Sequence, residues 1–572
     1  MAEKIISPGV FQNESDQSLV QRGIAGTSTA IVGPTVLGRP FVPTYVTSYS
    51  EYLSKFGSTF KSGSYYYEYL TSIAAREYFQ NGGQTLLVTR VISGSSTAQT
   101  YASATVTALN PSASIVIEAL AWGDQMNNTS SMSNGALTNG SSTNVRWEVT
   151  TTNTGSGTFS LAVRRGDDND SQKNYLETWP NLSLDPALPN YISRVIGDQK
   201  PVYALDSDGN PYIQITGSYA NASQYVRVSS ISLPQVDSID NNGNFKANLY
   251  ATAIPSLGSG SYGGSFAGGV AATNRVALMN ETMTSANMEG FGVSDYTIAF
   301  NLLTNKDEYK YNVLLAPAVG LDSAAATTII STVEARGDAF APIHSGVYGT
   351  AISTAANTAA GQSSNYSATY YPWIQLYNSN LGKNIWAPAS TIMAGVLAFN
   401  DQVGAEWFAP AGLNRGGVPS VLRAERKLSQ ADRDTLYNAN VNPLATFPGE
   451  GVVVFGQKTL QRKATSLDRV NVRRLLIALK DFIGQVGNNL VFEQNTIATR
   501  NRFLAQVNPY LESVVQRQGL YAYKVVMDDT NNTPDVIDRN QLVGQIYIQP
   551  TKTAEFIILN FNVLPTGATF PA

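Results

Sequence analysis

The chain has 572 residues, 43% of them hydrophobic and 14% charged, and this length exceeds what one hydrophobic core normally organises, so several domains are expected. Its formal net charge of −4 gives no overall electrostatic reason to bind nucleic acid or an anionic membrane directly. The chain has no cysteine, which excludes disulfides, thiolate nucleophiles and cysteine-ligated metals.

Residues 1–22 show little core-forming periodicity and are predicted to form an extended N-terminal arm. The motif "SPGVFQNE" at Ser7–Glu14 places a Pro-Gly turn or extended element before a short apolar pair. The arm lacks the apolar core of a signal peptide, and no run approaches the roughly 18 apolar residues of a membrane span. We therefore expect synthesis in the cytoplasm and no membrane insertion.

Residues 23–92 and 270–447 are predicted to form one α/β middle domain. The first segment contains a buried strand, a helix capped by Ser48 or Ser50, and a second helix with apolar residues from Tyr66 onward. A β-run follows the Gly-Gly pair that ends the second helix. Strands and helices that alternate in this way favour an α/β unit.

The second segment of the middle domain continues the same pattern. A buried strand is predicted over Tyr311–Gly320, and a helix over Asp322–Gly337 has Asp322 as its expected N-cap. Another buried strand, "AFAPIHSG", contains His344, the one histidine of the chain.

Residues 93–269 are predicted to be one or two β-rich outer domains inserted into the middle domain. Helix signals nearly vanish there, and turns rich in Ser, Thr, Asn and Gly separate short β-runs such as "VRWEVTT" and "TFSLAVRRG". The Gly/Ser-rich stretch Ser256–Gly269 is the expected flexible return to the middle domain.

Residues 448–551 are predicted to form an α+β C-terminal domain. Apolar residues over Val472–Ile483 recur at the helical period, and Gly484 is the expected end of that helix. A second helix covers about residues 496–518, and Pro509 inside it indicates either a kink or a new N-cap. Two strands complete the domain.

The C-terminal residues 552–572 contain "AEFIILNFNV" at Ala554–Val563, whose apolar side chains would lie on both faces of a strand. A strand that is apolar on both faces is typically buried on both faces, whereas chain ends are usually exposed unless something holds them. The stretch therefore predicts a C-terminal strand that is buried by another element.

The residue inventory gives little support for catalysis. His344 ends a buried run and is expected to be structural, and one histidine without cysteine makes a zinc site improbable. "GSGSYG" at Gly258–Gly263 matches a dinucleotide-binding pattern only inside a Gly/Ser-rich tract, and "GDDND" at Gly166–Asp170 is expected to be a surface turn. We expect no catalytic, cofactor or metal site.

Collinear motifs across both ends of the chain resemble the tail sheath proteins of contractile-tailed bacteriophages. They cover nearly the whole chain except about Ser93–Gly269. The motifs lie at Ser7–Glu14, Ile31–Gly57, Tyr78–Val91, Tyr370–Gly412, Val452–Leu460, Val470–Ile483, Leu490–Asn495 and Met527–Phe561.

The resemblance implies a structural virion protein that is not an enzyme. Sheath subunits polymerise as stacked hexameric rings around the tail tube, and contraction drives the tube through the host envelope for DNA ejection. The other implied partners are the baseplate and tail terminator proteins. The resemblance also implies that arms from neighbouring subunits add strands to the sheet of the C-terminal domain, which is β-augmentation.

The arms are assigned to Ile5–Glu14 and Ala554–Val563, and the receiving sheet to Leu520–Met527 and Gln541–Gln549. This interpretation explains a terminal strand that is apolar on both faces, because another copy would bury it. The residues expected to exchange are Ile5, Ile6, Val10, Phe11, Ala554, Phe556, Ile557, Ile558, Leu559 and Phe561.

A basic block lies in the C-terminal third, because residues 421–517 hold 14 Lys and Arg against 8 Asp and Glu, a local charge of +6. It indicates either a face for an acidic partner or a solvated face with ion pairs. Arg473, Arg474 and Lys480 are candidates for exposed charges that face the tail tube; intersubunit ion pairs are the alternative.

Other protein classes remain open on the sequence alone. A sheath of a related contractile machine, either a bacteriocin or a secretion apparatus, would share the core. A secreted β-rich adhesin would explain the polar insertion but not the capped helices. A hydrolase would have to use His344 as its base.

Overall fold

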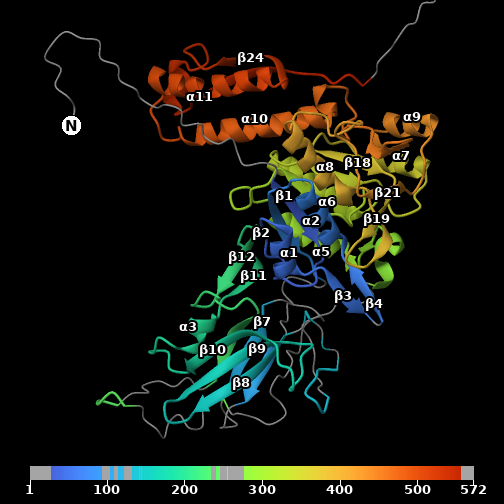
Figure 1. The fold of residues 1–572 in the computed structure, drawn as a ribbon. Coiled ribbons are helices and arrows are strands. Elements are labelled where there is room, and N and C mark those ends of the chain that lie inside the picture. Colours follow the sequence, from blue (N-terminus) through green and yellow to red (C-terminus); the bar gives the residue numbers. More distant parts are fainter. Residues whose placement is uncertain are drawn as a thin grey trace, which may run out of the picture.

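The computed structural model contains a β-rich part, a central α/β part and a helical C-terminal part, which lie from bottom to top of Figure 1. No helix among its described residues is long and apolar enough to cross a membrane. The described residues are 28–92 except Gly63, 103–107, 114–120, 132–232 except 139, 141 and 144, 240–244, 254–255 and 276–555.

The central part is built on a four-stranded sheet whose strands come from both sides of the β-rich insertion. The strand order is β16-β1-β5-β2, and β1 pairs in parallel with both β5 and β16. Strands β1 and β5 are buried almost throughout, as is typical of strands covered on both faces. The strands are β1 (Ser28–Gly33), β2 (Thr44–Val46), β5 (Thr85–Arg90) and β16 (Val313–Leu315).

A second sheet, of order β17-β18-β22-β23, continues the central part. The segments between β18 and β22 form a three-stranded sheet of order β20-β19-β21. The strands are β17 (Ala341–His344), β18 (Ser367–Tyr371), β19 (Ile374–Asn378), β20 (Lys383–Ala387), β21 (Val421–Ala424), β22 (Val441–Phe447) and β23 (Gly451–Val454). The helices after the insertion are α5 (Val293–Leu302), α6 (Ala324–Arg336), α7 (Ile352–Ala360), α8 (Ser390–Val403) and α9 (Gln430–Asn438).

The helices before the insertion were predicted in part. Helix α1 (Tyr49–Phe56) begins after Ser48, whose hydroxyl accepts the N–H of Glu51, and ends at Gly57, which has a positive φ of 68°. Helix α2 (Leu70–Gln80) starts later than predicted, because β4 (Tyr65–Glu68) pairs with β3 (Thr59–Ser62). Consecutive tyrosines favour strand, and the hairpin overrides the helical pattern there.

The predicted N-cap of α6 was wrong by one residue. The Ser323 hydroxyl accepts the N–H of Ala325 and caps the helix. The carboxylate of Asp322 instead accepts the N–H of Val347, 3.4 Å away in a following loop. The predicted strand over Tyr311–Gly320 is also shorter, since only Val313–Leu315 is extended in the sheet.

The β-rich part has sheets of its own, of orders β10-β9-β8, β13-β7-β6 and β11-β12. Its apolar core forms a separate cluster that includes Trp147 and Phe159. In the predicted surface turn at Gly166–Asp170, Asp168 is buried and accepts from Arg164 Nε at 2.7 Å, so surface exposure was the wrong expectation for this residue. The elements are β6 (Ser103–Thr107), β7 (Ser114–Ala119), β8 (Val145–Asn153), β9 (Thr158–Arg165), β10 (Tyr175–Ser183), α3 (Ile192–Ile196), β11 (Lys200–Leu205), β12 (Pro211–Thr216) and β13 (Val226–Ile231).

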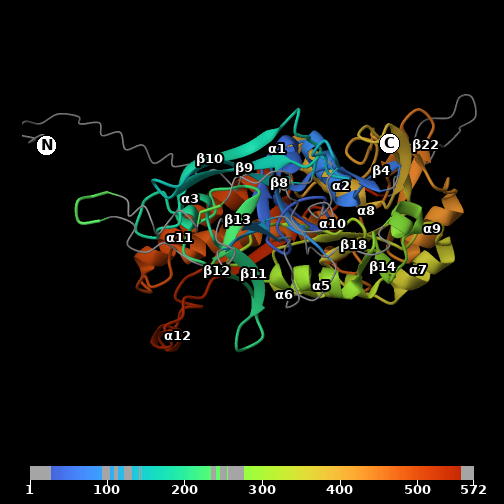
Figure 2. The same cartoon turned by 90° about the horizontal axis from the view of Figure 1, so that it is seen from below.

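The C-terminal part consists of two long helices under a β-hairpin (Figure 1). Helix α10 (Val470–Asn488) continues past Gly484, where it was predicted to end, and α11 (Ile497–Gln516) is one helix with Pro509 inside it, so a new N-cap there was wrong. The hairpin pairs β24 (Leu520–Val526) with β25 (Gln545–Pro550). Between these strands lies the short helix α12 (Pro534–Asp538), which projects from the body in Figure 2.

After the insertion the described chain resumes at Val276, and Met279 and Met283 already pack in the central core. Glu289 follows between β14 (Asn287–Met288) and β15 (Phe291–Gly292). Glu289 is completely buried, and its carboxyl accepts the N–H of Leu70, the first residue of α2, at 2.8 Å. Burial raises the pKa of Glu289 to about 8, so the carboxyl is mostly protonated at neutral pH. A neutral acid group thus joins the two sides of the insertion.

We predict that Glu289→Gln removes a pH-dependent loss of stability. The raised pKa means that the folded state binds a proton more tightly than the unfolded chain, so wild-type stability falls as pH rises from about 4.5 to 8. Between pH 5 and pH 8 the wild type should lose about 3 kcal/mol more than the variant. Thermal unfolding across pH measures this, with Glu281→Gln as an exposed control in the same segment. Equal pH dependence in wild type and Glu289→Gln would contradict the assignment.

Candidate interaction site in the C-terminal part

The β24–β25 hairpin is a two-stranded antiparallel sheet that lies on α10 and α11. The helices contact each other through Phe482 and Tyr510, whose ring centroids are 3.8 Å apart, and through an apolar cluster that includes Leu479 and Leu511. Tyr523 and Ile548, which pair across the hairpin, pack against this cluster. One face of the hairpin is therefore seated on the helices.

The outer face and both outer edges of the hairpin are open within the described residues. Tyr521 and Tyr547 are 66% and 57% exposed. Neither strand has a further strand partner in the described part of the chain, where the sheet order is only β24-β25. An isolated hairpin is marginally stable in water, and unpaired strand edges can accept another strand. The geometry therefore offers two edges for β-augmentation.

An apolar groove of about 750 Å³ opens between the second half of α10 and the hairpin. Phe492, in the α10–α11 turn, is among the residues that line it and is fully exposed with a positive φ of 70°. A large exposed apolar side chain next to an apolar groove is typical of an interaction surface. The side chains that line the groove include Leu479, Ile483, Phe503, Met527, Ile546 and Ile548.

Most residues predicted to exchange between subunits lie outside the described residues. Ala554 is described and is exposed, just before the last described residue, Glu555. The first receiving strand lies within the predicted range, whereas the second begins only at Gln545 and ends at Pro550, one residue beyond the predicted end. The residues outside the described part are Ile5, Ile6, Val10, Phe11, Phe556, Ile557, Ile558, Leu559 and Phe561.

The expectation that Arg473 and Arg474 are exposed is wrong. Arg474 is buried and makes a bidentate ion pair with Asp401 of α8, with Nη1–Oδ1 and Nη2–Oδ2 distances of 2.8 and 2.6 Å. Arg473 is also buried, and its guanidinium lies 4.1 Å from the ring centroid of Tyr366. Both guanidinium groups therefore make contacts within the subunit. Lys480 is exposed, as predicted.

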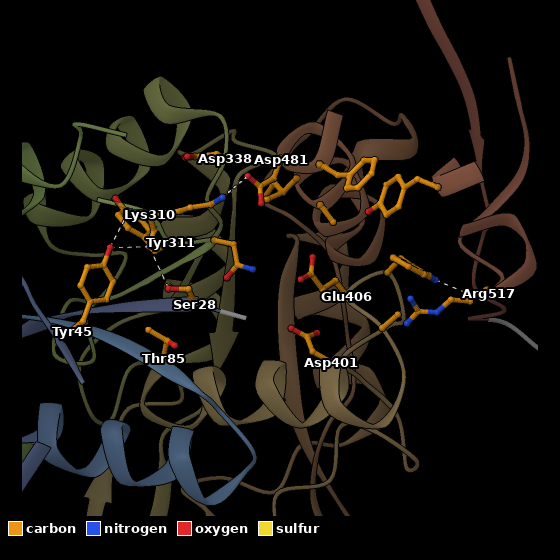
Figure 3. Close-up of a pocket in the computed structure, with 17 residues that line it drawn as sticks. Ser28, Tyr45, Thr85, Lys310, Tyr311, Asp338, Asp401, Glu406, Asp481 and Arg517 are labelled. Atoms are coloured by element: carbon orange, nitrogen blue, oxygen red, sulfur yellow. Dashed lines mark hydrogen bonds and ion pairs between the residues drawn. The ribbon is translucent and has the colours of Figure 1, made fainter. Parts of the chain in front are cut away.

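A cleft of about 450 Å³ separates the central part from the C-terminal helices (Figure 3). Lys310 reaches across it to Asp481, with an N–O distance of 3.1 Å. Asp401 and Glu406 face the cleft nearby. Burial raises the pKa of Glu406 to about 7, while Arg474 opposes this shift. No group of three or more potential metal ligands occurs among the described residues.

His344 ends β17 and is buried, which confirms the prediction of a structural strand-end residue. Its Nδ1 lies 3.0 Å from the Ser390 hydroxyl, which donates to the carbonyl of Pro317 at 3.0 Å. Because that hydroxyl already donates, His344 must donate to it. This tautomer cannot take a proton from Ser390, and Ser390 is itself closed to solvent. The pair is unsuited to nucleophilic catalysis.

Two protein-family models match much of the central part and the C-terminal part. Residues 289–460 match the phage tail sheath protein central domain. Residues 462–564 match the phage tail sheath C-terminal domain. The resemblance to phage tail sheath proteins is confirmed. The interaction site described above lies within the second of these sheath domains.

Curated tail sheath proteins match over part of the chain. The tail sheath protein of Enterobacteria phage T4 is 42% identical over 187 residues, 33% of this chain and 28% of the relative. That of Vibrio phage KVP40 is 41% identical over 194 residues, 34% of this chain and 29% of the relative. The match thus spans less than a third of the length of either relative.

Solved structures resemble the fold along most of the chain. A sheath tail protein from Listeria innocua has a TM-score of 0.52 and 11% identity, over 93% of this chain and 97% of that one. A chain of the anti-feeding prophage baseplate in its contracted state has a TM-score of 0.50 and 13% identity, over 98% and 99%. The mixed α/β fold is therefore that of sheath proteins.

The sequence reasoning missed the partners of Glu555, although it included Ala554 beside it. Glu555 accepts from Arg469 Nε at 2.7 Å and Nη2 at 3.0 Å, from Gln457 Nε2 at 3.1 Å and from the hydroxyl of Tyr437. An acidic residue directly before the apolar run "FIILNF" was the available signal. Its partners, 86 to 118 positions earlier, had no local signal.

We predict that Arg474→Met destabilises the protein by about 3–5 kcal/mol, because it leaves the carboxylate of Asp401 without its bidentate partner in a buried site. Arg502→Met is the matched control, since Arg502 pairs with Glu493 at 3.8 Å on an exposed surface and should change stability by no more than about 1 kcal/mol. Urea unfolding measures both. Similar losses in the two variants would show that the buried pair has no special role.

We predict that His344 contributes an acid-sensitive component of stability. Burial lowers the pKa of His344 to about 3, so the unfolded chain takes up a proton below about pH 6.5 and the folded chain does not. Stability is therefore lost as pH falls from 6.5 toward 3, by about 2 kcal/mol between pH 7 and pH 5. Since the chain has one histidine, His344→Asn should lack this component in calorimetry. A variant with the wild-type pH profile would refute it.

Proposed function

We propose that the chain is the structural subunit of a contractile tail sheath and polymerises by strand exchange between subunits. The observation that carries this proposal is the β24–β25 hairpin, whose two outer edges are open within the described residues. It lies in the region that matches the sheath C-terminal domain. Each hairpin can thus accept one strand at either edge, from two different neighbours.

The two chain ends supply the exchanged strands in this proposal. The C-terminal stretch Ala554–Val563 begins four residues after the end of β25 and has apolar side chains on both faces of a strand. Its backbone can pair with an open strand edge while its side chains cover the apolar groove. The N-terminal arm, residues 1–22, supplies the second strand. Contacts of this kind are heterologous, so they extend a helical polymer and do not close a dimer.

The polymer is proposed to consist of stacked hexameric rings around a tail tube, bounded by baseplate and tail terminator proteins, in a virion assembled in the host cytoplasm. Contraction would move the folded subunits as rigid bodies while the strands hold neighbours together, and new contacts between subunits would supply the driving free energy. Of the basic residues considered, Lys480 remains the candidate for a reversible, salt-sensitive contact with the tube.

A sheath of a related contractile injection machine would use the same hairpin, and it is the second candidate. The structural likeness to the anti-feeding prophage chain concerns the fold alone. The identities of 41% and 42% to phage tail sheath segments favour the phage tail. Both candidates make the same protein a structural polymer and differ only in the particle that carries it.

We predict that deletion of residues 552–572 abolishes polymerisation while the remaining chain folds. Electron microscopy of the purified wild type should show tubes of uniform width, and the truncated chain should give single subunits, because the hairpin edge has lost its added strand. Circular dichroism checks the fold. Deletion of residues 1–22 serves as the parallel test of the other arm. Tubes of normal width from the C-terminal truncation would overturn the proposed strand exchange.

A further inference from the structure

The C-terminal segment does not leave the subunit directly from the hairpin. After β25, the backbone N–H of Thr551 donates to the carbonyl of Gly519 at 3.2 Å, and among the described residues this is the last backbone hydrogen bond to the hairpin. The chain then runs away from β24 and toward the end of the layer where α9 and the start of α10 lie (Figure 1). Its next contacts are with α9, with the N-cap residue of α10 and with the segment that follows β23.

Thr553 and Glu555 are held by three separate segments. Gln457, which follows β23, donates to the Thr553 hydroxyl at 2.6 Å and to the Glu555 carboxylate at 3.1 Å. Arg469, the N-cap residue of α10, forms a bidentate pair with Glu555, and Tyr437 of α9 donates to the same carboxylate. We call Tyr437, Gln457, Arg469 and Glu555 the exit clamp.

The residues of the exit clamp make further contacts with their neighbours, and its charged groups are only partly exposed to water. The Arg469 and Glu555 side chains are 24% and 20% exposed. Lys458 places its ammonium 3.8 Å from the ring centroid of Tyr437 and donates to the Tyr437 carbonyl at 2.8 Å. Burial raises the pKa of Glu555, but the hydrogen bonds from Arg469 and Tyr437 outweigh burial and lower it. The carboxylate is therefore ionised and satisfied by four donor groups.

This network fixes Glu555 to the folded body of the subunit, 17 residues before the end of the 572-residue sequence. It joins the segment to the central part and to the first turn of α10, whereas the hairpin has already been left four residues earlier. A third strand of the subunit's own hairpin would have to begin beside that hairpin. The clamp instead holds Glu555 on α9, on the N-cap residue of α10 and on the segment after β23.

We propose that the exit clamp is a positioning device that fixes the point and the direction in which the C-terminal arm leaves the subunit. This inference rests on the proposed strand exchange and adds the residues that aim the arm. A free arm would lose backbone and side-chain entropy when a neighbour captures it. A clamped arm has lost part of that entropy beforehand, so capture is stronger and polymerisation begins at a lower concentration.

The test uses the absence of cysteine from the chain. Spin labels at Ala554→Cys and at Lys463→Cys, both exposed positions, report the distance between the arm's base and the loop before α10. In the free subunit, we expect a narrow distance distribution for the otherwise wild-type chain, a broad one with Glu555→Ala and an intermediate one with Glu555→Gln. Glu493→Ala removes an exposed carboxylate of the same part and should leave the distribution narrow.

The second measurement is the critical concentration for polymerisation of the full-length unlabelled chain. Glu555→Ala should raise it about tenfold, which corresponds to the loss of one charge-assisted interaction, and Glu493→Ala should not change it. The positioning role is overturned if Glu555→Ala keeps the narrow distribution, or if the distribution broadens while the critical concentration stays the same. Since the distances are measured in free subunits, failure of the clamp is distinguishable from failure of strand exchange, which the truncated chain tests.

Discussion

The buried ion pair between Arg474 of α10 and Asp401 of α8 joins the C-terminal part to the central part in one defined geometry. Helix α10 contributes Val470 and Ile477 to the central core and Leu479 to the C-terminal core, so this one helix packs in both hydrophobic cores. A bidentate pair defines two N–O directions at once and opposes rotation of α10 about its axis. Buried pairs of this kind contribute little net stability, but they can specify one geometry.

That orientation matters because the hairpin depends on α10 and α11 for its position. The sheet is too small to be stable alone, and its inner face is covered by the apolar cluster of the two helices. Its outer edges point away from this support and remain open within the described residues. A rigid support with an unsatisfied backbone edge is what a subunit needs if its neighbours are to complete it without rearranging it.

Sequence patterns predicted features that depend on neighbouring residues, such as helix caps. They failed for features that depend on contacts between residues far apart in the sequence. The caps Ser48 and Gly57 were predictable because their hydrogen bonds are made within one helix. Gly484 did not end α10, because packing of Val486 in the C-terminal core offsets the low helix propensity of glycine. The burial of Arg474 depends on Asp401, 73 positions away, and no periodicity reveals such a partner. The open hairpin was foreseen, since its two strands are adjacent in the chain apart from a short excursion.

The attachment of the β-rich part has a further consequence for how chains of this kind can change in size. The insertion begins after Arg90 at the end of β5, and α2 runs back along β5, so the start of α2 at Leu70 lies at the same end of the sheet. At the same end of the sheet, Glu289 of the returning segment accepts the N–H of Leu70. The insertion therefore starts and ends at the same end of the central sheet. Inserts of very different lengths can be accommodated at this position, because the entropic cost of closing a loop grows only slowly with its length. The C-terminal part with its hairpin would not be affected.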